Sequence, residues 1–378
     1  MKIFILVFFC LISVNVYSQS TSIDWLLPPQ GFGIPNLNSS GSSSIINNVA
    51  NIGSINPASI SSFNNFSVGI SYQINPEIKK GWLNDSPIER NKQLIPQSFG
   101  SSYKLGNISL GLCFSQQYNT KTDFNWFGYE SNITEFEGNV FSYSAIAAYS
   151  FNELFKKNSR LDVGLNISFN QADFSQKNQS SLIELSDDAV NYHFGIMYSV
   201  KNADELETRV GFSYQTNTKF EADYNSQSGM TVVIRKIDSP YSTDDINAGN
   251  IISGNNPDKI NLDLTVDISS NVKVLASGKG IFWEKDKNTL DDQFEFSLGS
   301  IYKINQMFSP ALSIYYTSRN YELGFYDLNE KFDALFLIAG LNLNLGMLNS
   351  DLVIADSHII SGDYRKQTII KLAVGFTF

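Results

Sequence analysis

Apolar and polar residues alternate along most of the chain beyond residue 65. A period of two is the pattern of a β-strand with one apolar and one polar face. The final segment shows it clearly, because Ile370, Leu372, Val374, Phe376 and the terminal Phe378 share one face. Such a face suits a membrane barrel, in which closure leaves no edge and one surface meets lipid.

The same alternation recurs in about fourteen segments, and an even number of antiparallel strands is typical of bacterial outer-membrane barrels. Short connections alternate with longer ones, such as residues 118–137, 176–188 and 223–257, as expected for periplasmic turns and outer loops. A soluble β-sandwich requires neither an even number of strands nor connections that alternate in length. We therefore predict an all-β transmembrane barrel in the bacterial outer membrane, with antiparallel strands near residues 66–74, 97–104, 108–114, 141–151, 161–169, 190–198, 210–214, 260–268, 272–283, 294–302, 312–316, 335–345, 352–354 and 370–378.

The residues before the first strand divide into two parts. Residues 1–18 resemble a secretory signal peptide, with Lys2, an apolar run and the small Ser18 before Gln19. The apolar run is too short to span a bilayer as a helix. Residues 19–64 are rich in Ser, Asn and Gly, yet they contain more apolar residues than a linker does. We predict a small N-terminal plug here, with a flexible tail as the alternative, and a barrel over residues 65–378.

Composition narrows the possible partners. The chain has 28 Phe and 18 Tyr but only 42% hydrophobic residues, which suits a barrel with a polar interior. Its net charge of -10 argues against nucleic acid as a partner. Cys113 is the one cysteine beyond the signal peptide, so no internal disulfide is expected. With only 2 histidines in the chain, we predict neither a metal site nor a cofactor.

Several charged residues fall on the polar faces of the predicted strands. Both signs are present, so the simplest interpretation is a set of ion pairs inside the barrel. The functional alternative is that Arg209, Lys273 or Lys279 binds the carboxylate of an amphipathic ligand. The inward charged residues are Asp162, Arg209, Asp263, Asp267, Lys273, Lys279, Glu295 and Lys371.

Signals for catalysis are weak. His193 shares a predicted inward face with Ser199 and Asn191, and a few barrels are hydrolases that use His with Ser or Asp. A histidine hydrogen-bonded to its neighbours is the simpler interpretation. Cys113 also faces inward, among small polar residues, without a signal for a reactive thiol. We predict that the protein is not an enzyme.

The residues just before the first strand carry a family resemblance. Asn56-Pro57-Ala58 precedes the strand at residues 66–74. This resembles the FadL family of outer-membrane transporters for hydrophobic compounds, which includes PorV-like barrels. The resemblance implies that residues 19–64 form a hatch inside a fourteen-stranded barrel. From the residues alone, Pro57 would fix a turn, and the Asn56 side chain can bond its own backbone.

We therefore predict passive uptake of hydrophobic or amphipathic small molecules. The alternative is a non-transport scaffold or secretion-system component whose outer loops bind another protein. An apolar surface inside the barrel would favour transport, whereas an interior lined only by charge pairs would favour the scaffold. The expected partners are outer-membrane lipid, a hydrophobic ligand and the barrel-assembly machinery, through the strand that ends at Phe378.

Overall fold

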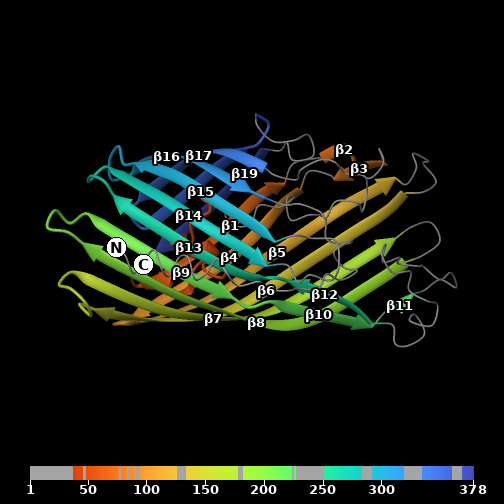
Figure 1. The fold of residues 1–378 in the computed structure, drawn as a ribbon, viewed down its shortest axis with the longest axis horizontal. Helices are drawn as coiled ribbons and strands as arrows, with labels where there is room; N and C mark the ends of the chain where they lie inside the picture. Colours follow the sequence, from red (N-terminus) through yellow and green to blue (C-terminus); the bar gives the residue numbers. More distant parts are fainter. Residues whose placement is uncertain are drawn as a thin grey trace.

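Fourteen antiparallel strands close into a barrel, as the alternation predicts (Figure 1). The computed structural model describes residues 37–45, 48–75, 78–82, 86–90, 93–125, 133–177, 182–223, 225–226, 251–282, 292–318, 334–359 and 368–378. The barrel strands are β1 (Phe66–Asn75), β4 (Gln93–Leu105), β5 (Ile108–Asn125), β6 (Ile133–Asn152), β7 (Ser159–Lys177), β8 (Leu182–Lys201), β9 (Glu207–Gln215), β13 (Asp258–Asp267), β14 (Val272–Phe282), β15 (Gln293–Tyr302), β16 (Phe308–Thr317), β17 (Ala334–Leu345), β18 (Leu348–Asp356) and β19 (Thr368–Thr377).

The first and last strands pair to close the cylinder. Ser67 lies opposite Thr377, and the ladder continues to Ile74 opposite Ile370. The rings of Phe66 and Phe378 stack with centroids 6.0 Å apart, and the Phe378 N–H donates to the Phe66 carbonyl at 2.8 Å. Closure satisfies the backbone groups that an open edge would leave unpaired, which a lipid environment requires.

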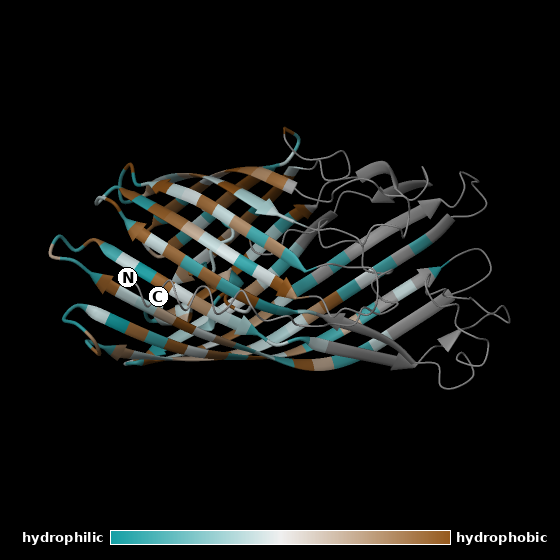
Figure 2. Cartoon of the chain, in the orientation of Figure 1, coloured by the Kyte–Doolittle hydropathy of each residue, from teal (hydrophilic) through white to brown (hydrophobic). Residues whose placement is uncertain are grey.

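Burial is the reverse of that in a soluble protein. On β5, Leu112 is 65% exposed whereas Ser109 is 1% exposed. The pattern repeats around the cylinder, so apolar residues form a band on the outer surface (Figure 2). On β6 the band runs from residue 141 to residue 151, close to the 9–11 residues of a strand that crosses a membrane. The outer surface is therefore built to face lipid.

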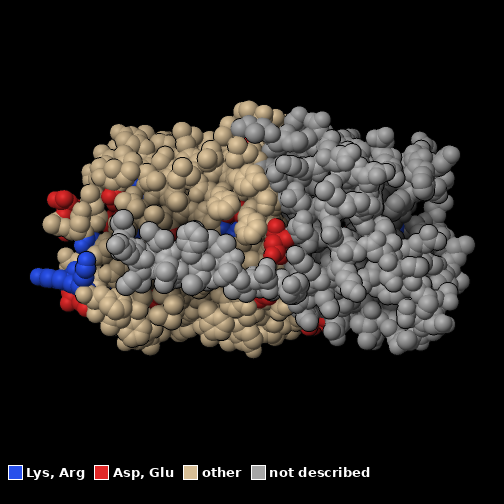
Figure 3. Space-filling view, viewed as in Figure 1, with Lys and Arg blue, Asp and Glu red and all other residues tan. Residues whose placement is uncertain are grey.

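The two ends of the barrel differ. Short turns join the strands at one end, including tight turns at Gly106 (φ 61°) and Gly346 (φ 76°), where positive φ suits glycine. We call this the periplasmic end, because barrels of this kind have short periplasmic turns. On the face shown in Figure 3, the charged side chains of the described residues gather largely at this end, and uncharged residues cover most of the flank.

The predicted loops at residues 118–137 and 176–188 are largely wrong. Strand β5 continues to Asn125 and β6 already begins at Ile133, while β7 ends at Lys177 and β8 begins at Leu182. Strands β5–β8 are longer than the other barrel strands (Figure 1), and they continue past the residues that form the apolar band. Beyond the band most residues are polar and the few apolar ones do not alternate regularly, so the pattern that reveals a strand is absent although the backbone ladder continues.

Shorter strands accompany the barrel at its outer end. β2 (Ile78–Trp82) and β3 (Ser86–Arg90) form a hairpin between β1 and β4. β10 (Thr218–Asp223) pairs with β12 (Ile251–Asn256), and β11 (Asn225–Ser226) pairs with β8. Most of the predicted long loop 223–257 lies outside the described residues. Within the described residues, no helix has the length and apolar character needed to cross a bilayer.

The described residues before β1 lie against the inner wall of the barrel. They comprise residues 37–45 and 48–63, here named the inner segment, with the 3₁₀ helices η2 (Val49–Asn51) and η3 (Pro57–Ser62). The predicted hatch, residues 19–64, includes them. The predicted signal peptide and the rest of residues 1–36 lie outside the described residues.

Candidate functional site on the inner wall of the barrel

Two wall carboxylates hold the first part of the inner segment. The Ser39 N–H donates to Asp351 Oδ2 on β18 at 3.3 Å. The Ser44 N–H donates to Asp263 Oδ1 on β13 at 2.9 Å, and the Ser44 hydroxyl donates to Asp263 Oδ2. Between them, the Ser42 N–H donates to Ser297 Oγ on β15 at 3.1 Å. Residues 37–45 are therefore bound to the β13–β18 side of the wall.

The second part of the inner segment is bound through the Asn56-Pro57-Ala58 triplet. Asn56 Oδ1 accepts the Ala58 N–H at 3.0 Å and caps η3, which Pro57 begins. Asn56 Nδ2 donates to the carbonyls of Ile196 on β8 and Phe212 on β9, at 3.1 and 3.0 Å. One side chain thus orders the helix and ties it to two neighbouring strands.

Glycines on the wall permit this close approach. A Cβ atom built on Gly195 would lie 2.0 Å from Asn56 Oδ1. One on Gly100 would lie 2.0 Å from the Val49 carbonyl oxygen. Both distances are far below van der Waals contact, so the inner segment and these wall positions fit only without a side chain at the glycine.

Residues that face the barrel interior form two rows that follow the strand pairing. On β7 and β8 the rows still contact the inner segment, through Asn166 and Gly195. On β13–β15 they lie closer to the outer end of the barrel than Asp263 and Ser297. The first row runs from β7 to β15 and the second from β8 to β16. A third row lies nearer the periplasmic end and contains Asp263, Ser277 and Ser297, which bind the inner segment. The first row is Asn166, His193, Gln215, Lys259, Ile281 and Gln293, and the second is Gly195, Ser213, Asn261, Lys279, Glu295 and Thr317.

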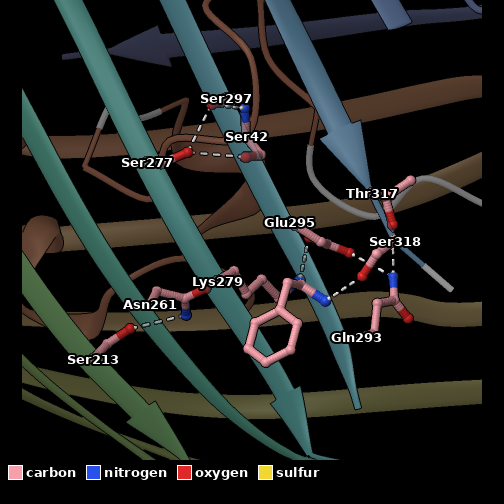
Figure 4. A network of polar contacts seen from close by, with 11 residues as sticks. Ser42, Ser213, Asn261, Ser277, Lys279, Gln293, Glu295, Ser297, Thr317 and Ser318 are labelled. Atoms are coloured by element: carbon pink, nitrogen blue, oxygen red, sulfur yellow. Dashed lines mark hydrogen bonds and ion pairs between the residues drawn. The ribbon is translucent and has the colours of Figure 1, made fainter. Parts of the chain in front are cut away.

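Most polar groups of these rows bind one another (Figure 4). Lys279 Nζ lies 3.1 Å from Glu295 Oε2. Gln293 Nε2 donates to Glu295 Oε1 at 3.1 Å and to Thr317 Oγ1 at 2.8 Å. Asn261 Nδ2 donates to Ser213 Oγ at 3.1 Å. The rows are therefore largely preorganised by their own hydrogen bonds.

Three groups of the first row lack a hydrogen-bond partner among the described residues. His193 is 3% exposed, and neither ring nitrogen is bonded. Gln293 is 2% exposed, and its Oε1 is unbonded. The Lys259 ammonium forms no ion pair with a described residue, whereas Lys279 in the second row pairs with Glu295. Lys259 is half-buried, whereas the other two groups are buried. Buried polar groups are usually bonded, so the His193 ring and Gln293 Oε1 mark the wall as a place for polar ligand atoms.

The strands that follow these rows around the barrel carry an apolar surface on their inner face. Six inward-facing residues of β16–β19 form a contiguous cluster with Leu37 of the inner segment, and we name these six the apolar arc. Its two aromatic rings lie 6.0 Å apart between centroids. On β17 and β18 the arc lies closer to the outer end of the barrel than Gly340 and Asp351, the two wall residues that contact Ser39. The apolar arc comprises Tyr315, Phe336, Ile338, Val353, Ala355 and Ile369.

No family model matches the sequence, and no curated protein matches it in sequence. Solved structures do match the fold. A FadL homologue from Pseudomonas aeruginosa has a TM-score of 0.63 at 13% identity, covering 96% of this chain and 99% of that chain. The Pseudomonas putida toluene transporter TodX has a TM-score of 0.58 at 13% identity, covering 92% and 99%. The monoaromatic hydrocarbon channel CymD has a TM-score of 0.57 at 12% identity, covering 97% and 99%.

The chain has the fold of the FadL-type outer-membrane barrels. The predicted strand number and closure are confirmed. The similarity extends over nearly the whole chain. At sequence identities of 12–13%, this similarity establishes the fold alone.

Within this FadL-type barrel, the three predicted ligand-binding cations all form ion pairs. Lys279 pairs with Glu295 on the side of the inner segment that is closer to the outer end of the barrel. Arg209 Nη2 lies 2.6 Å from Glu207 Oε2, and Lys273 Nζ lies 3.3 Å from Asp267 Oδ1, both toward the periplasmic end. The structure therefore separates Lys279 from the other two.

Sequence reasoning missed Lys259, because the predicted strand began at residue 260, one position too late. The alternation to Asn261 and Asp263 would have placed Lys259 on the inward face. Lys371 was recognised as inward, and its Nζ is buried without a hydrogen-bond partner. Neither lysine forms an ion pair with a described residue, whereas the three predicted cations do.

The candidate catalytic groups are not assembled. His193 forms no hydrogen bond with Ser199 or Asn191, so the simpler expectation of a hydrogen-bonded histidine is also wrong. The Cys113 thiol is buried and points toward the Ala50 carbonyl of the inner segment, 3.9 Å away. Among the described residues, no cluster of His, Cys, Asp and Glu has metal-binding geometry.

Proposed function

We propose that this FadL-type barrel carries hydrophobic or amphipathic small molecules passively across the outer membrane. The observation that carries the proposal is the division of the interior outward of the inner segment. One side is the apolar arc on β16–β19, and the other is the polar first and second rows on β7–β16. An amphipathic molecule has one apolar part and one polar part. Its apolar part can contact the apolar arc while its polar part contacts the polar rows.

The similar structures support this class of cargo. TodX is named as a toluene transporter and CymD as a monoaromatic hydrocarbon channel. Both are channels rather than enzymes, and we extend that to this chain as a non-enzymatic role. An apolar surface inside the barrel favours transport, and nothing in the described residues favours the alternative of a protein-binding scaffold.

We propose that residues 19–64 act as a hatch. The described part of this region is hydrogen-bonded to both sides of the wall, through Asp263 and Asp351 and through the Asn56 side chain. A cargo molecule must displace part of the hatch or leave sideways. Of the predicted ligand contacts, Lys279 lies where cargo would first meet the hatch, whereas Arg209 and Lys273 lie on the periplasmic side, where cargo would leave. Their ligand roles remain predictions.

Two further partners remain predictions. Outer-membrane lipid is expected around the apolar band. The barrel-assembly machinery is expected to recognise the last strand, which ends at Phe378 and pairs with β1.

Filling the apolar arc tests the proposal. Ala355 lies within the arc and is fully buried, so Ala355→Trp should obstruct cargo. Ala145 lies exposed on the lipid-facing side of β6, so Ala145→Trp is the matched control. Both variants and the wild type would be expressed in a Gram-negative host lacking its own hydrophobic-compound transporters, and the initial uptake rates of radiolabelled toluene and long-chain acids would be measured.

We expect wild type and Ala145→Trp to raise uptake equally, and Ala355→Trp to lose most of the increase. Heat-modifiable gel mobility would confirm that both variants are folded. Uptake by wild type no faster than in the empty host would reject transport of these compounds. Equal uptake by the two variants would reject the apolar arc as part of the path.

A further inference from the structure

The unbonded groups of the first row differ in hydrogen-bonding type. Lys259 is a donor only, whereas Gln293 Oε1 is an acceptor only. The orientation of the Gln293 amide is fixed, because its NH₂ group donates to Glu295 Oε1 and Thr317 Oγ1. A flipped amide would place its oxygen against the Glu295 carboxylate, which has no hydrogen to donate. The free atom of Gln293 is therefore an acceptor that needs a donor.

These groups are close to one another. Lys259 and Gln293 lie on the same row, two strands apart. Glu295 Oε1, in the second row, accepts from Gln293. The ring of His193 lies on the same row as Lys259, with Gln215 between them. In its neutral form this ring offers one further donor and one further acceptor.

A plain carboxylate cannot satisfy this set. Its oxygens accept hydrogen bonds, so it could bind Lys259 or the donor nitrogen of His193. It would leave Gln293 Oε1 without a donor in a buried position, which is unfavourable. A neutral hydrocarbon would leave every one of these groups unbonded. The wall therefore matches a head group that contains an anion and a hydrogen-bond donor side by side.

We infer that the cargo of this barrel is an acid whose head group also carries an amide N–H or hydroxyl donor, as in N-acyl amino acids. The carboxylate binds Lys259, the N–H donates to Gln293 Oε1, and the acyl chain lies against the apolar arc. This inference rests on the proposed transport function and specifies its substrate class.

A pair of ligands that differ by one donor tests the inference. N-dodecanoylglycine has an amide N–H beside its carboxylate, and its ester analogue, dodecanoyloxyacetic acid, has an oxygen in that place. Pentadecanoic acid has the same chain length without either group. Affinities would be measured by competition against radiolabelled pentadecanoic acid on the mature protein in phospholipid nanodiscs, with empty nanodiscs as the background.

We expect the amide to bind the wild type at least about tenfold more tightly than the ester, because the ester leaves a buried acceptor unbonded. Gln293→Met should bring this ratio close to one without weakening pentadecanoic acid. Lys259→Met should weaken all three acids alike. Gln171→Met, on the outward face of β7, and Lys201→Met, exposed at the periplasmic end of β8, are the matched controls and should change neither result.

The outcomes separate this inference from the function on which it rests. Equal binding of amide and ester by the wild type would overturn the inference while leaving transport of acids intact, and this comparison requires no variant to fold. A ratio that survives in Gln293→Met would equally overturn the assignment of Gln293. No binding of any of the three acids would overturn the proposed role with amphipathic acids itself.

Discussion

Asn56 should decide how firmly the second part of the inner segment is held. Replacing it with leucine removes the two hydrogen bonds to the wall carbonyls and the cap on the Ala58 N–H. Each wall bond contributes about 0.5–1.5 kcal/mol and the cap about 1 kcal/mol, so roughly 2–4 kcal/mol of docking free energy is lost. At about 1.4 kcal/mol for each factor of ten, this is roughly a 30- to 700-fold change in local opening.

Hydrogen exchange measures this opening directly. The peptide that contains η3 would be followed by mass spectrometry in nanodiscs, since the Ser59 N–H donates to the Asn56 carbonyl at 2.9 Å and reports on this turn. Gly195→Ala should give the same acceleration from the wall side, because its Cβ would meet Asn56 Oδ1. Gly278→Ala is the matched control, since its nearest neighbour there, Phe296, lies at ordinary contact distance, 3.6 Å.

One result would refute this reasoning. If η3 exchanged less than about threefold faster in Asn56→Leu than in wild type, the loss would be under about 1 kcal/mol. The side-chain bonds would then contribute little, and apolar packing of η3 would hold the segment instead.

Three further predictions concern the wall and the membrane surface. Asp263→Leu should accelerate exchange in residues 39–45 but not in η3, because the two parts have separate anchors; equal acceleration in both would show that they open together. Leu112→Arg should lower the free energy of unfolding in lipid vesicles by about 2–4 kcal/mol in a urea titration, and no change would place this residue outside the membrane. Phe378→Ala should reduce the folded fraction on heat-modifiable gels of outer membranes, whereas Phe155→Ala, which removes a ring pair of the same 6.0 Å separation in a turn, should not.

The alternation was enough to predict the cylinder, because lipid demands an apolar residue at every second position. It was enough on β6, where Tyr143 and Ala145 face outward and Ser142 and Ser144 face inward. It failed for the outer halves of β5–β8, which extend past the apolar band. Most residues there are polar and the few apolar ones do not alternate regularly, so only the backbone pairing reveals the strands.

The candidate site was less predictable. The register of β14 and β15 places Lys279 beside Glu295. A list of strands without their register does not predict this ion pair. The role of Asn56 as a tie to β8 and β9 spans more than one hundred residues of chain and leaves no local signal. Lys259 was lost through a one-residue error in a strand boundary, the least reliable feature of such predictions.

The sequence by itself determined the class of fold, the number of strands and the residues that face lipid, because these depend on a period of two and on the solvent outside. The tertiary structure alone decided which inward charges are paired, which polar groups remain unbonded, and that the apolar arc adjoins the polar rows. Those facts depend on which strands become neighbours and on their register. An enclosed interior forms only when the first strand pairs with the last.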